Sequence, residues 1–199
     1  TKATTSKNGS IVKKCSVCGK VASTTTVKYA KTFKLSTTSY TFDGKVKTPS
    51  VTVKDSAGKT LKKNTDYTVT YASGRKYAGT YKVTVKMKGN YTGTKTLTFK
   101  INPQSISKCK VTLSKTTFTY NGKAQKPTVT IKNAAGTKLS TSNYTVTYSS
   151  GRKNVGTYKV TVKLKGSYTG SKTYTFKINP AATKISKLTA GKKSVIVNI

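Results

Sequence analysis

Residues 79–103 read GTYKVTVKMKGNYTGTKTLTFKINP, and residues 156–180 read GTYKVTVKLKGSYTGSKTYTFKINP. Of these 25 aligned positions, 21 are identical. In each copy, apolar or aromatic residues alternate with lysine and threonine on both sides of a short segment bounded by glycines. A period of two with β-branched and aromatic residues is typical of a half-buried strand. Each copy is therefore predicted to form a β-hairpin.

The segments that precede the two hairpins also correspond to each other. Leu61 and Leu139 are 78 positions apart, and Asp66 and Asn143 are 77 apart, so one residue is lost in a polar loop between them. Short alternating runs are separated by turn signals roughly every 8 to 12 residues, which is the pattern of an antiparallel β-sandwich. We predict two such modules, at residues 32–103 and 104–180, and six or seven short strands in the first.

The ends of the chain lie outside the repeat. Within residues 1–31, strand-like runs flank the tight knuckle Cys15-Ser16-Val17-Cys18-Gly19 and predict a small β-hairpin. An isolated hairpin is marginally stable in water, so we expect this one to pack on the first module. Residues 181–199 do not continue the repeat and are predicted to begin a separate segment. The link between the modules, at residues 102–108, is short and contains Pro103, so we expect the modules to lie end to end.

The alternation also selects the residues that face the interior, and both modules should share one fold. The predicted core of the first module is Leu35, Phe42, Val51, Val53, Val69, Tyr81, Val83, Val85 and Phe99. The predicted core of the second is Leu113, Tyr120, Val129, Ile131, Val146, Tyr158, Val160, Val162 and Phe176.

The charge balance is extreme, with 39 lysine and arginine residues against 3 acidic ones, no histidine, and a net charge of +36. All three acids are aspartates of the first module, and asparagine replaces each of them in the second. The pairs are Asp43/Asn121, Asp55/Asn133 and Asp66/Asn143. Because Asp and Asn share turn and capping chemistry, we expect these side chains to stabilise turns rather than to act as charges.

This composition argues against an enzyme. General acid–base catalysis has almost no candidates without histidine or glutamate, and the Ser/His/Asp and Cys/His arrangements are excluded. A lysine nucleophile needs an apolar pocket or a cationic neighbour, and the sequence indicates neither. We predict no catalytic residues and no cofactor.

Three cysteines, Cys15, Cys18 and Cys109, are too few for a disulfide framework. Cys15 and Cys18 have the spacing of half a zinc knuckle. A structural zinc site needs four ligands, and Cys109 is the one cysteine left. A local disulfide and two free thiols are the favoured alternatives. We therefore predict no metal site and keep Cys15 and Cys18 as the candidates for one.

Two repeated loops contain candidate binding residues. Arginine makes bidentate contacts to carboxylate, sulfate or phosphate, and the chain has one arginine at the same position of each module. A solvated turn is the alternative. The candidate anion-binding residues are Arg75, Lys76, Arg152 and Lys153.

Tyr91 and Tyr168 lie in the loops of the repeated hairpins, unlike most other tyrosines, which occupy inward positions. They are candidates for exposed ligand contacts. The alternative, which we favour, is that they fold back and close the end of the sandwich.

The lysines follow the outward positions of the strands. Outward lysine on an edge strand prevents edge-to-edge aggregation, and lysine in excess creates a surface that attracts polyanions. Non-specific binding to DNA is expected through counterion release. Arginine is rare and no recognition motif is present, so specific nucleic-acid binding is not predicted. No apolar run reaches the roughly 18 residues of a membrane span, and we expect a monomer.

The motif YTFDGK at residues 40–45, the motif DYTVTY at 66–71 and the repeated hairpin resemble the Ig-like repeats of secreted and cell-surface proteins of Gram-positive gut bacteria, the Firmicutes. The stretch KATTSKNGSIVKKCSVCGKV at residues 2–21 resembles a Cys-knuckle segment found upstream of such repeats. Residues 183–188 and 194–199 resemble the first two strands of a fibronectin type III domain, which would be truncated here.

The resemblance implies an Ig-like sandwich fold and an extracellular location at the cell wall surface, and it supplies no catalytic residues. Our hypothesis is a non-catalytic spacer or adhesion module. The alternatives are a surface protein that binds polyanions such as teichoic acid, sulfated glycan or nucleic acid, and an accessory region of a larger secreted enzyme.

Overall fold

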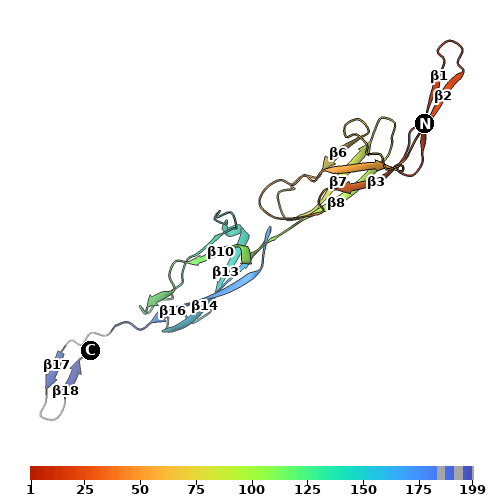
Figure 1. The fold of residues 1–199 in the computed structure, drawn as a ribbon. Helices are drawn as coiled ribbons and strands as arrows, with labels where there is room; N and C mark the ends of the chain where they lie inside the picture. Colours follow the sequence, from red (N-terminus) through yellow and green to blue (C-terminus); the bar gives the residue numbers. More distant parts are fainter. Residues whose placement is uncertain (183–186, 191–194, 199) are drawn as a thin grey trace. The chain divides into compact units, whose positions relative to one another are not determined.

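The computed structural model describes residues 1–182, 187–190 and 195–198 (Figure 1). Apart from two short 3-10 helices, at Ile106–Lys108 and Thr141–Asn143, its regular elements are all strands. The chain divides into two units, Thr1–Gln104 and Ser105–Ile199. The predicted all-β fold is confirmed, while the finer division into four segments stays a prediction.

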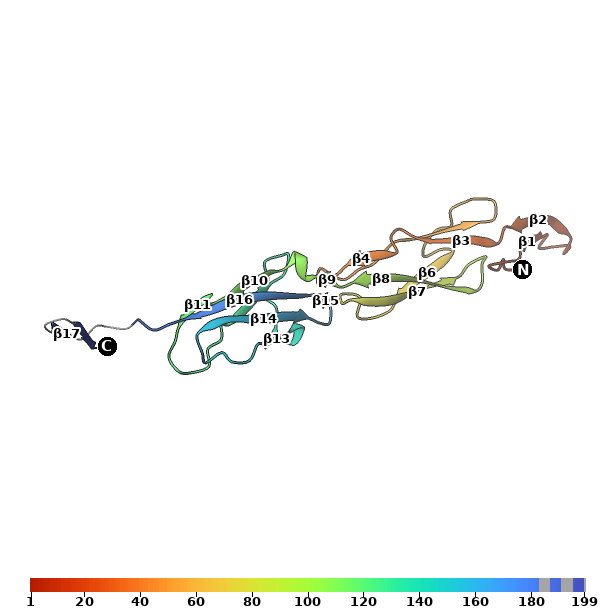
Figure 2. The same ribbon diagram turned by 90° about the horizontal axis from the view of Figure 1, so that it is seen from below.

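The first unit is a sandwich of two sheets that enclose one core. Figure 2 shows its strands from a second direction. The two-stranded sheet joins β3 (Ala30–Leu35) to β5 (Val51–Asp55). The four-stranded sheet has the order β4 (Ser39–Thr41), β8 (Thr94–Asn102), β7 (Gly79–Met87) and β6 (Tyr67–Tyr71).

The second unit repeats this topology, as the sequence repeat predicts. Its two-stranded sheet joins β10 (Lys110–Leu113) to β12 (Val129–Lys132). Its four-stranded sheet has the order β11 (Thr117–Thr119), β16 (Ser171–Asn179), β14 (Gly156–Leu164) and β13 (Tyr144–Tyr148). Two short strands, β9 and β15, lie at Gln104–Ser105 and Tyr168–Thr169.

One strand pair in each sandwich differs from the antiparallel prediction. β4 runs parallel to β8, with Tyr40 opposite Ile101, and β11 runs parallel to β16, with Phe118 opposite Ile178. The prediction was wrong here because alternation shows which face a strand presents, and it carries no information on the direction of its neighbour.

The repeated hairpin has the register that its alternation predicts. In β7 and β8, Tyr81 lies opposite Phe99 and Val83 opposite Leu97. Val83 is fully buried, whereas Lys82, next to it in the chain, is exposed on the other face. The period of two thus separates an apolar inner face from an outer face of lysine and threonine.

The predicted core is confirmed in large part, with eleven buried positions. These are Leu35, Phe42, Val53, Val83, Val85, Phe99, Val129, Ile131, Val160, Val162 and Phe176. Six more are half-buried: Val51, Val69, Tyr81, Leu113, Val146 and Tyr158. Tyr120 is a wrong prediction, because it is 43% exposed whereas its counterpart Phe42 is 9% exposed. Its phenolic hydroxyl favours a position in contact with water, which a phenyl ring does not.

The N-terminal hairpin is present as predicted, with β1 (Gly9–Lys14) antiparallel to β2 (Val21–Val27). It is attached to the first sandwich through the segment that precedes it. Ala3 is fully buried, its N–H donates to Asn90 O at 2.9 Å, and its carbonyl accepts from Thr92 N–H at 2.8 Å. A Cβ on Gly9 would meet Ala3 N at 2.3 Å, so this close approach requires glycine. The hairpin itself extends beyond the sandwich (Figure 1).

In two of the three pairs, aspartate and asparagine can replace each other because both accept the same backbone hydrogen bonds in a turn. Asp55 Oδ1 accepts from the N–H groups of Ala57 and Lys59, both at 2.9 Å. Asn133 Oδ1 makes the same two bonds in the second unit, at 3.0 and 2.9 Å. Asp43 and Asn121 likewise each accept one N–H from two residues further on. The third pair differs, because the Asp66 side chain accepts from Lys62 N–H, whereas Asn143 contributes a backbone bond, from its N–H to Ser140 O.

At the C-terminus, β17 (Lys187–Ala190) pairs antiparallel with β18 (Val195–Asn198). The strands predicted at residues 183–188 and 194–199 fall partly outside the described residues. The fibronectin type III resemblance therefore stays a prediction. Among the described residues, no helix has the length and apolar character needed to cross a membrane.

Candidate functional site

The arginine of the first repeated loop is held by its own chain. Arg75 Nε donates to Lys47 O at 3.1 Å, and its Nη1 donates to Ala72 O at 2.6 Å. The guanidinium carbon lies 5.1 Å from the centre of the Tyr71 ring, a cation–π geometry. Because these contacts fix the guanidinium against backbone carbonyls and a ring, the residue first of all stabilises the loop.

The second loop repeats the stacking. Arg152 lies 5.1 Å from the centre of the Tyr148 ring. The Tyr148 hydroxyl donates to Pro127 O at 2.6 Å, as Tyr71 does to Pro49 O at 2.7 Å. Arg152 Nε is buried and has no hydrogen-bond partner within the described part of the chain.

The lysines of these loops are exposed, in contrast to the half-buried arginines. Lys76 Nζ lies 5.1 Å from the centre of the Tyr77 ring, and Lys76 lines a shallow pocket with Val46, Gly74 and Arg75. The structure thus brings the predicted anion-binding residues together in each loop. In each loop the arginine guanidinium also contacts groups of the protein itself. Anion binding by these residues therefore remains a hypothesis.

In each unit, the hydroxyl group of one tyrosine contacts two backbone carbonyl groups of the arginine loop. The Tyr81 hydroxyl lies 2.7 Å from Gly74 O and 2.9 Å from Tyr77 O. Tyr158 repeats this with Gly151 O at 2.7 Å and Asn154 O at 2.8 Å. Because the two carbonyls belong to opposite ends of the turn, contact with one hydroxyl stabilises the turn.

Tyr81→Phe should therefore loosen the loop at residues 74–78 and lower the free energy of unfolding by about 0.5–1.5 kcal/mol, the worth of one hydrogen bond. Hydrogen–deuterium exchange should show faster exchange in this loop. Tyr158→Phe should do the same at residues 151–155. Tyr120→Phe is the matched control, because that ring is exposed. Unchanged exchange in both loops would contradict the role given to the two hydroxyls.

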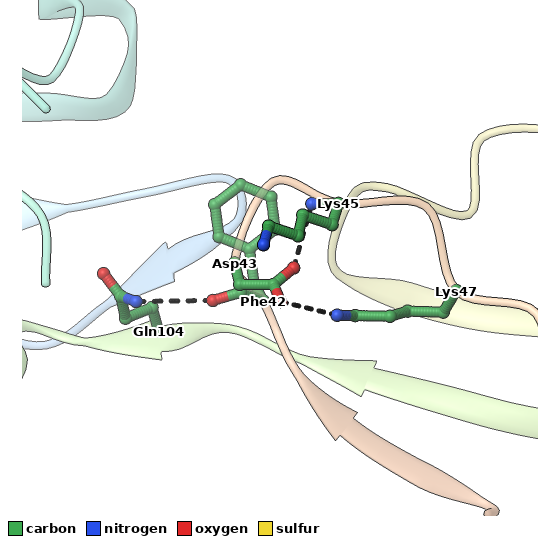
Figure 3. A network of polar contacts seen from close by, with 5 residues as sticks. All are labelled: Phe42, Asp43, Lys45, Lys47 and Gln104. Carbon is green, nitrogen blue, oxygen red and sulfur yellow. Dashed lines mark hydrogen bonds and ion pairs between the residues drawn. The ribbon is translucent and has the colours of Figure 1, made fainter. Parts of the chain in front are cut away.

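A polar network in the first unit surrounds Asp43 (Figure 3). Lys47 Nζ contacts Asp43 Oδ2 at 2.6 Å, and Lys45 N–H donates to Asp43 Oδ1 at 2.9 Å. The hydrogen bond from Lys47, followed by that from Lys45 N–H, lowers the pKa of the Asp43 carboxyl. Beside it, Gln104 Nε2 donates to Phe42 O at 3.3 Å.

The second unit shows that the charge of this network is dispensable. Asn121 occupies the position of Asp43, and Gln125 occupies that of Lys47. Gln125 Nε2 donates instead to Thr119 O at 2.8 Å. A neutral amide thus serves the same turn, so the ion pair is not part of a site common to both units.

The two loop tyrosines fold back, and exposed ligand contact was the wrong alternative for them. Tyr91 is 7% exposed and Tyr168 is 9% exposed. Asn133 Nδ2 donates to the Tyr168 hydroxyl at 3.4 Å. Burial, with smaller contributions from the carboxylates of Asp66 and Asp55, raises the pKa of Tyr91. Both rings are buried, as the favoured alternative predicts.

Cys15 and Cys18 lie at the exposed tip of the N-terminal hairpin. Cys18 N–H donates to Cys15 Sγ at 3.5 Å. This bond, with further contributions from the Cys18 side chain and Val17 N–H, lowers the pKa of the Cys15 thiol. Cys109 is half-buried in the other unit, and its burial raises the pKa of its thiol. The structure contains no disulfide between the three cysteines.

The exposed lysines gather most regularly on the outer face of the four-stranded sheet of each unit. On this face lysines and threonines alternate along β7 and β14, whereas β8 and β16 present hydroxyl side chains that are followed by one lysine. We call this surface the lysine–threonine face. Its lysines are Lys82, Lys86 and Lys100 in the first unit and Lys159, Lys163 and Lys177 in the second.

The geometry of this face follows from strand spacing. Lys82 and Lys86 are four residues apart on one strand, which places their Cα atoms about 13 Å apart. Threonine hydroxyls lie between the lysines, and in the second unit Thr161 and Thr173 hydrogen bond across the strands at 3.0 Å. The face therefore presents cations at regular intervals, with hydroxyl groups between them.

Comparison with known proteins gives one family match. The model of the MBG domain family matches residues 109–182, which span most of the second module. A search of curated proteins found no match. Among solved structures, the chain is similar to the crystal structure of invasin, described as a bacterial integrin-binding protein, with 14% identity and a TM-score of 0.34. The similarity covers 96% of this chain and 49% of the other, so this chain spans about half of the length of invasin.

Proposed function

We propose that this chain is a non-catalytic repeat segment of a bacterial surface protein and acts as a spacer and adhesion module outside the cell. The observation that carries the proposal is the repeat itself, because the same sandwich is built twice with the same loops and the same outer face. Repetition of a module extends a structure and multiplies a contact surface, and it adds no chemistry. The similarity of residues 109–182 to the MBG domain supports it.

The side chains support the non-catalytic part of the proposal. The chain has no histidine and no glutamate, and its three aspartates serve turns or have asparagine counterparts. Among the described residues, no group of three or more His, Cys, Asp or Glu is placed to hold a metal ion. Presentation on the wall of a Gram-positive bacterium is the more specific form of the proposal and rests on the resemblance of the repeats.

A second candidate function is polyanion binding, and the lysine–threonine face favours it. Three lysines and their threonine neighbours recur on each unit, and the chain has a net charge of +36. Teichoic acid and sulfated glycans are polyanions with hydroxyl-bearing backbones that such a face could contact. No feature of the described residues favours the third hypothesis, an accessory region of an enzyme.

The spacer role requires that the two modules be held apart in solution. We therefore expect small-angle X-ray scattering to give a radius of gyration well above about 16 Å, the value for one compact globule of this length. The measurement should be made at moderate and at high salt, so that charge repulsion alone does not extend the chain. A value near that of a globule at both salt concentrations would reject the spacer.

A further inference from the structure

The tip of the N-terminal hairpin has the backbone geometry of a metal-binding knuckle. Cys15 N–H donates to Lys20 O at 2.8 Å, and Gly19 N–H donates to Cys15 O at 3.0 Å. Gly19 has φ of +68°, a conformation that glycine adopts without strain. Cys18 N–H points at Cys15 Sγ, at 3.5 Å. The turn therefore holds two sulfur atoms on a tight loop and directs a backbone donor at one of them.

The ligand count shows what the site lacks. A structural zinc ion is bound by four ligands in a tetrahedron, commonly four cysteines. This tip supplies two. The third cysteine, Cys109, belongs to the other unit and is half-buried, and the chain contains no histidine. The two missing ligands are most simply supplied by the same two residues of another copy.

We propose that the Cys15–Cys18 knuckle is half of a zinc site, and that two copies of this chain share one zinc ion through their hairpin tips. Each cysteine that enters the site as a thiol releases one proton to the solvent as its sulfur bonds to the metal. No electron is transferred.

A second, independent observation is the apolar surface of the same hairpin. Eight large hydrophobic residues of residues 1–182 are exposed, and four of them lie here: Ile11, Val12, Val17 and Val21. Val17, between the two cysteines, is 94% exposed. An apolar side chain in this position gains nothing from the sandwich of its own unit. Contact between two tips would bury it beside the metal.

The charge of the metal centre reduces the cost of bringing two copies together. Zinc bound by four thiolates has a net charge of −2, and such a centre needs positive neighbours. Lys13, Lys14 and Lys20 flank the knuckle and are exposed in each copy. These six lysines can surround the anionic centre, which offsets part of the repulsion between two strongly basic chains.

The test uses the full 199-residue chain, kept reduced, with zinc chloride added in steps. We expect saturation at one zinc ion for two chains. Analytical ultracentrifugation should show the mass doubling from 21.4 kDa as zinc is added, and returning when a chelator removes it. Cobalt in place of zinc should give the strong visible absorption of a tetrahedral thiolate site, which reports the ligands directly.

Variants make the test specific. Cys15→Ser and Cys18→Ser should each abolish the doubling of mass and the cobalt spectrum, whereas Cys109→Ser should leave both unchanged. Val17→Lys keeps all ligands and should weaken the dimer at least tenfold. The proposal is overturned if reduced protein binds no zinc, if one zinc ion binds per monomer without a change of mass, or if Cys109→Ser has the effect expected of Cys15→Ser.

Discussion

Phe99→Ala should lower the free energy of unfolding of the first unit by about 3–5 kcal/mol. The Phe99 ring is 1% exposed and is one of the largest fully buried side chains of the unit. Its centroid is 5.8 Å from that of Tyr40 in edge-to-face geometry and 5.7 Å from that of Tyr81. Removing it leaves a cavity and takes away both aromatic contacts.

Urea denaturation followed by hydrogen–deuterium exchange separates this effect from a general loss of stability. Phe99→Ala should increase exchange in residues 32–103, and Phe176→Ala should do so in residues 109–179. Val83→Ala removes less volume and should cost about 1–3 kcal/mol. Thr98→Ala, on the exposed face of the same strand, is the control and should stay within about 0.5 kcal/mol. If Phe99→Ala cost no more than Thr98→Ala, the assignment of the inner face would be wrong.

The success of the core prediction has a simple physical origin. Val83 and Val85 alternate with lysine and threonine, and only one register of a strand can bury both valines at once. Where the pattern changes, the prediction fails. Tyr120 was assigned to the core because it aligns with Phe42, but a hydroxyl was added at that position and the ring is exposed. Leu61 is buried and was missed because it lies between two strands, where no alternation marks it.

The candidate site was less predictable because it depends on contacts between distant segments. The sequence shows that Arg75 and Arg152 recur, but not that Arg75 donates to Lys47 O, 28 residues away. For Tyr91 the sequence left two alternatives open, and the folded-back ring that we favoured is confirmed by its burial. The outer face was predictable in part, since Lys82 and Lys86 share a strand face. The full set of lysines on this face can be identified only from the register of β7 with β8, which places Lys100 on the same surface.

The affinity of the chain for a polyanion such as heparin should fall steeply with salt. By analogy with DNA, 6–10 neutralised charges would reduce affinity by about 10³–10⁵ between 50 and 200 mM salt. Replacing all six lysines of the lysine–threonine face by alanine should remove most of this dependence, because each lost contact flattens the logarithmic slope by about 0.9. Isothermal titration calorimetry at several salt concentrations measures both the affinity and the slope.

Two matched variants decide where the polyanion is bound. Replacing six exposed lysines away from the face, Lys45, Lys59, Lys62, Lys115, Lys123 and Lys138, removes the same charge and should reduce affinity far less. Equal losses from the two sets would mean that the whole surface acts as a diffuse field. Arg75→Ala with Arg152→Ala removes 2 of the 39 basic residues and should change affinity little, because Arg75 already donates to Lys47 and Ala72 carbonyls. If this double variant alone abolished binding, the loops would be the site, and a dedicated polyanion receptor would replace the spacer as the better account of this chain.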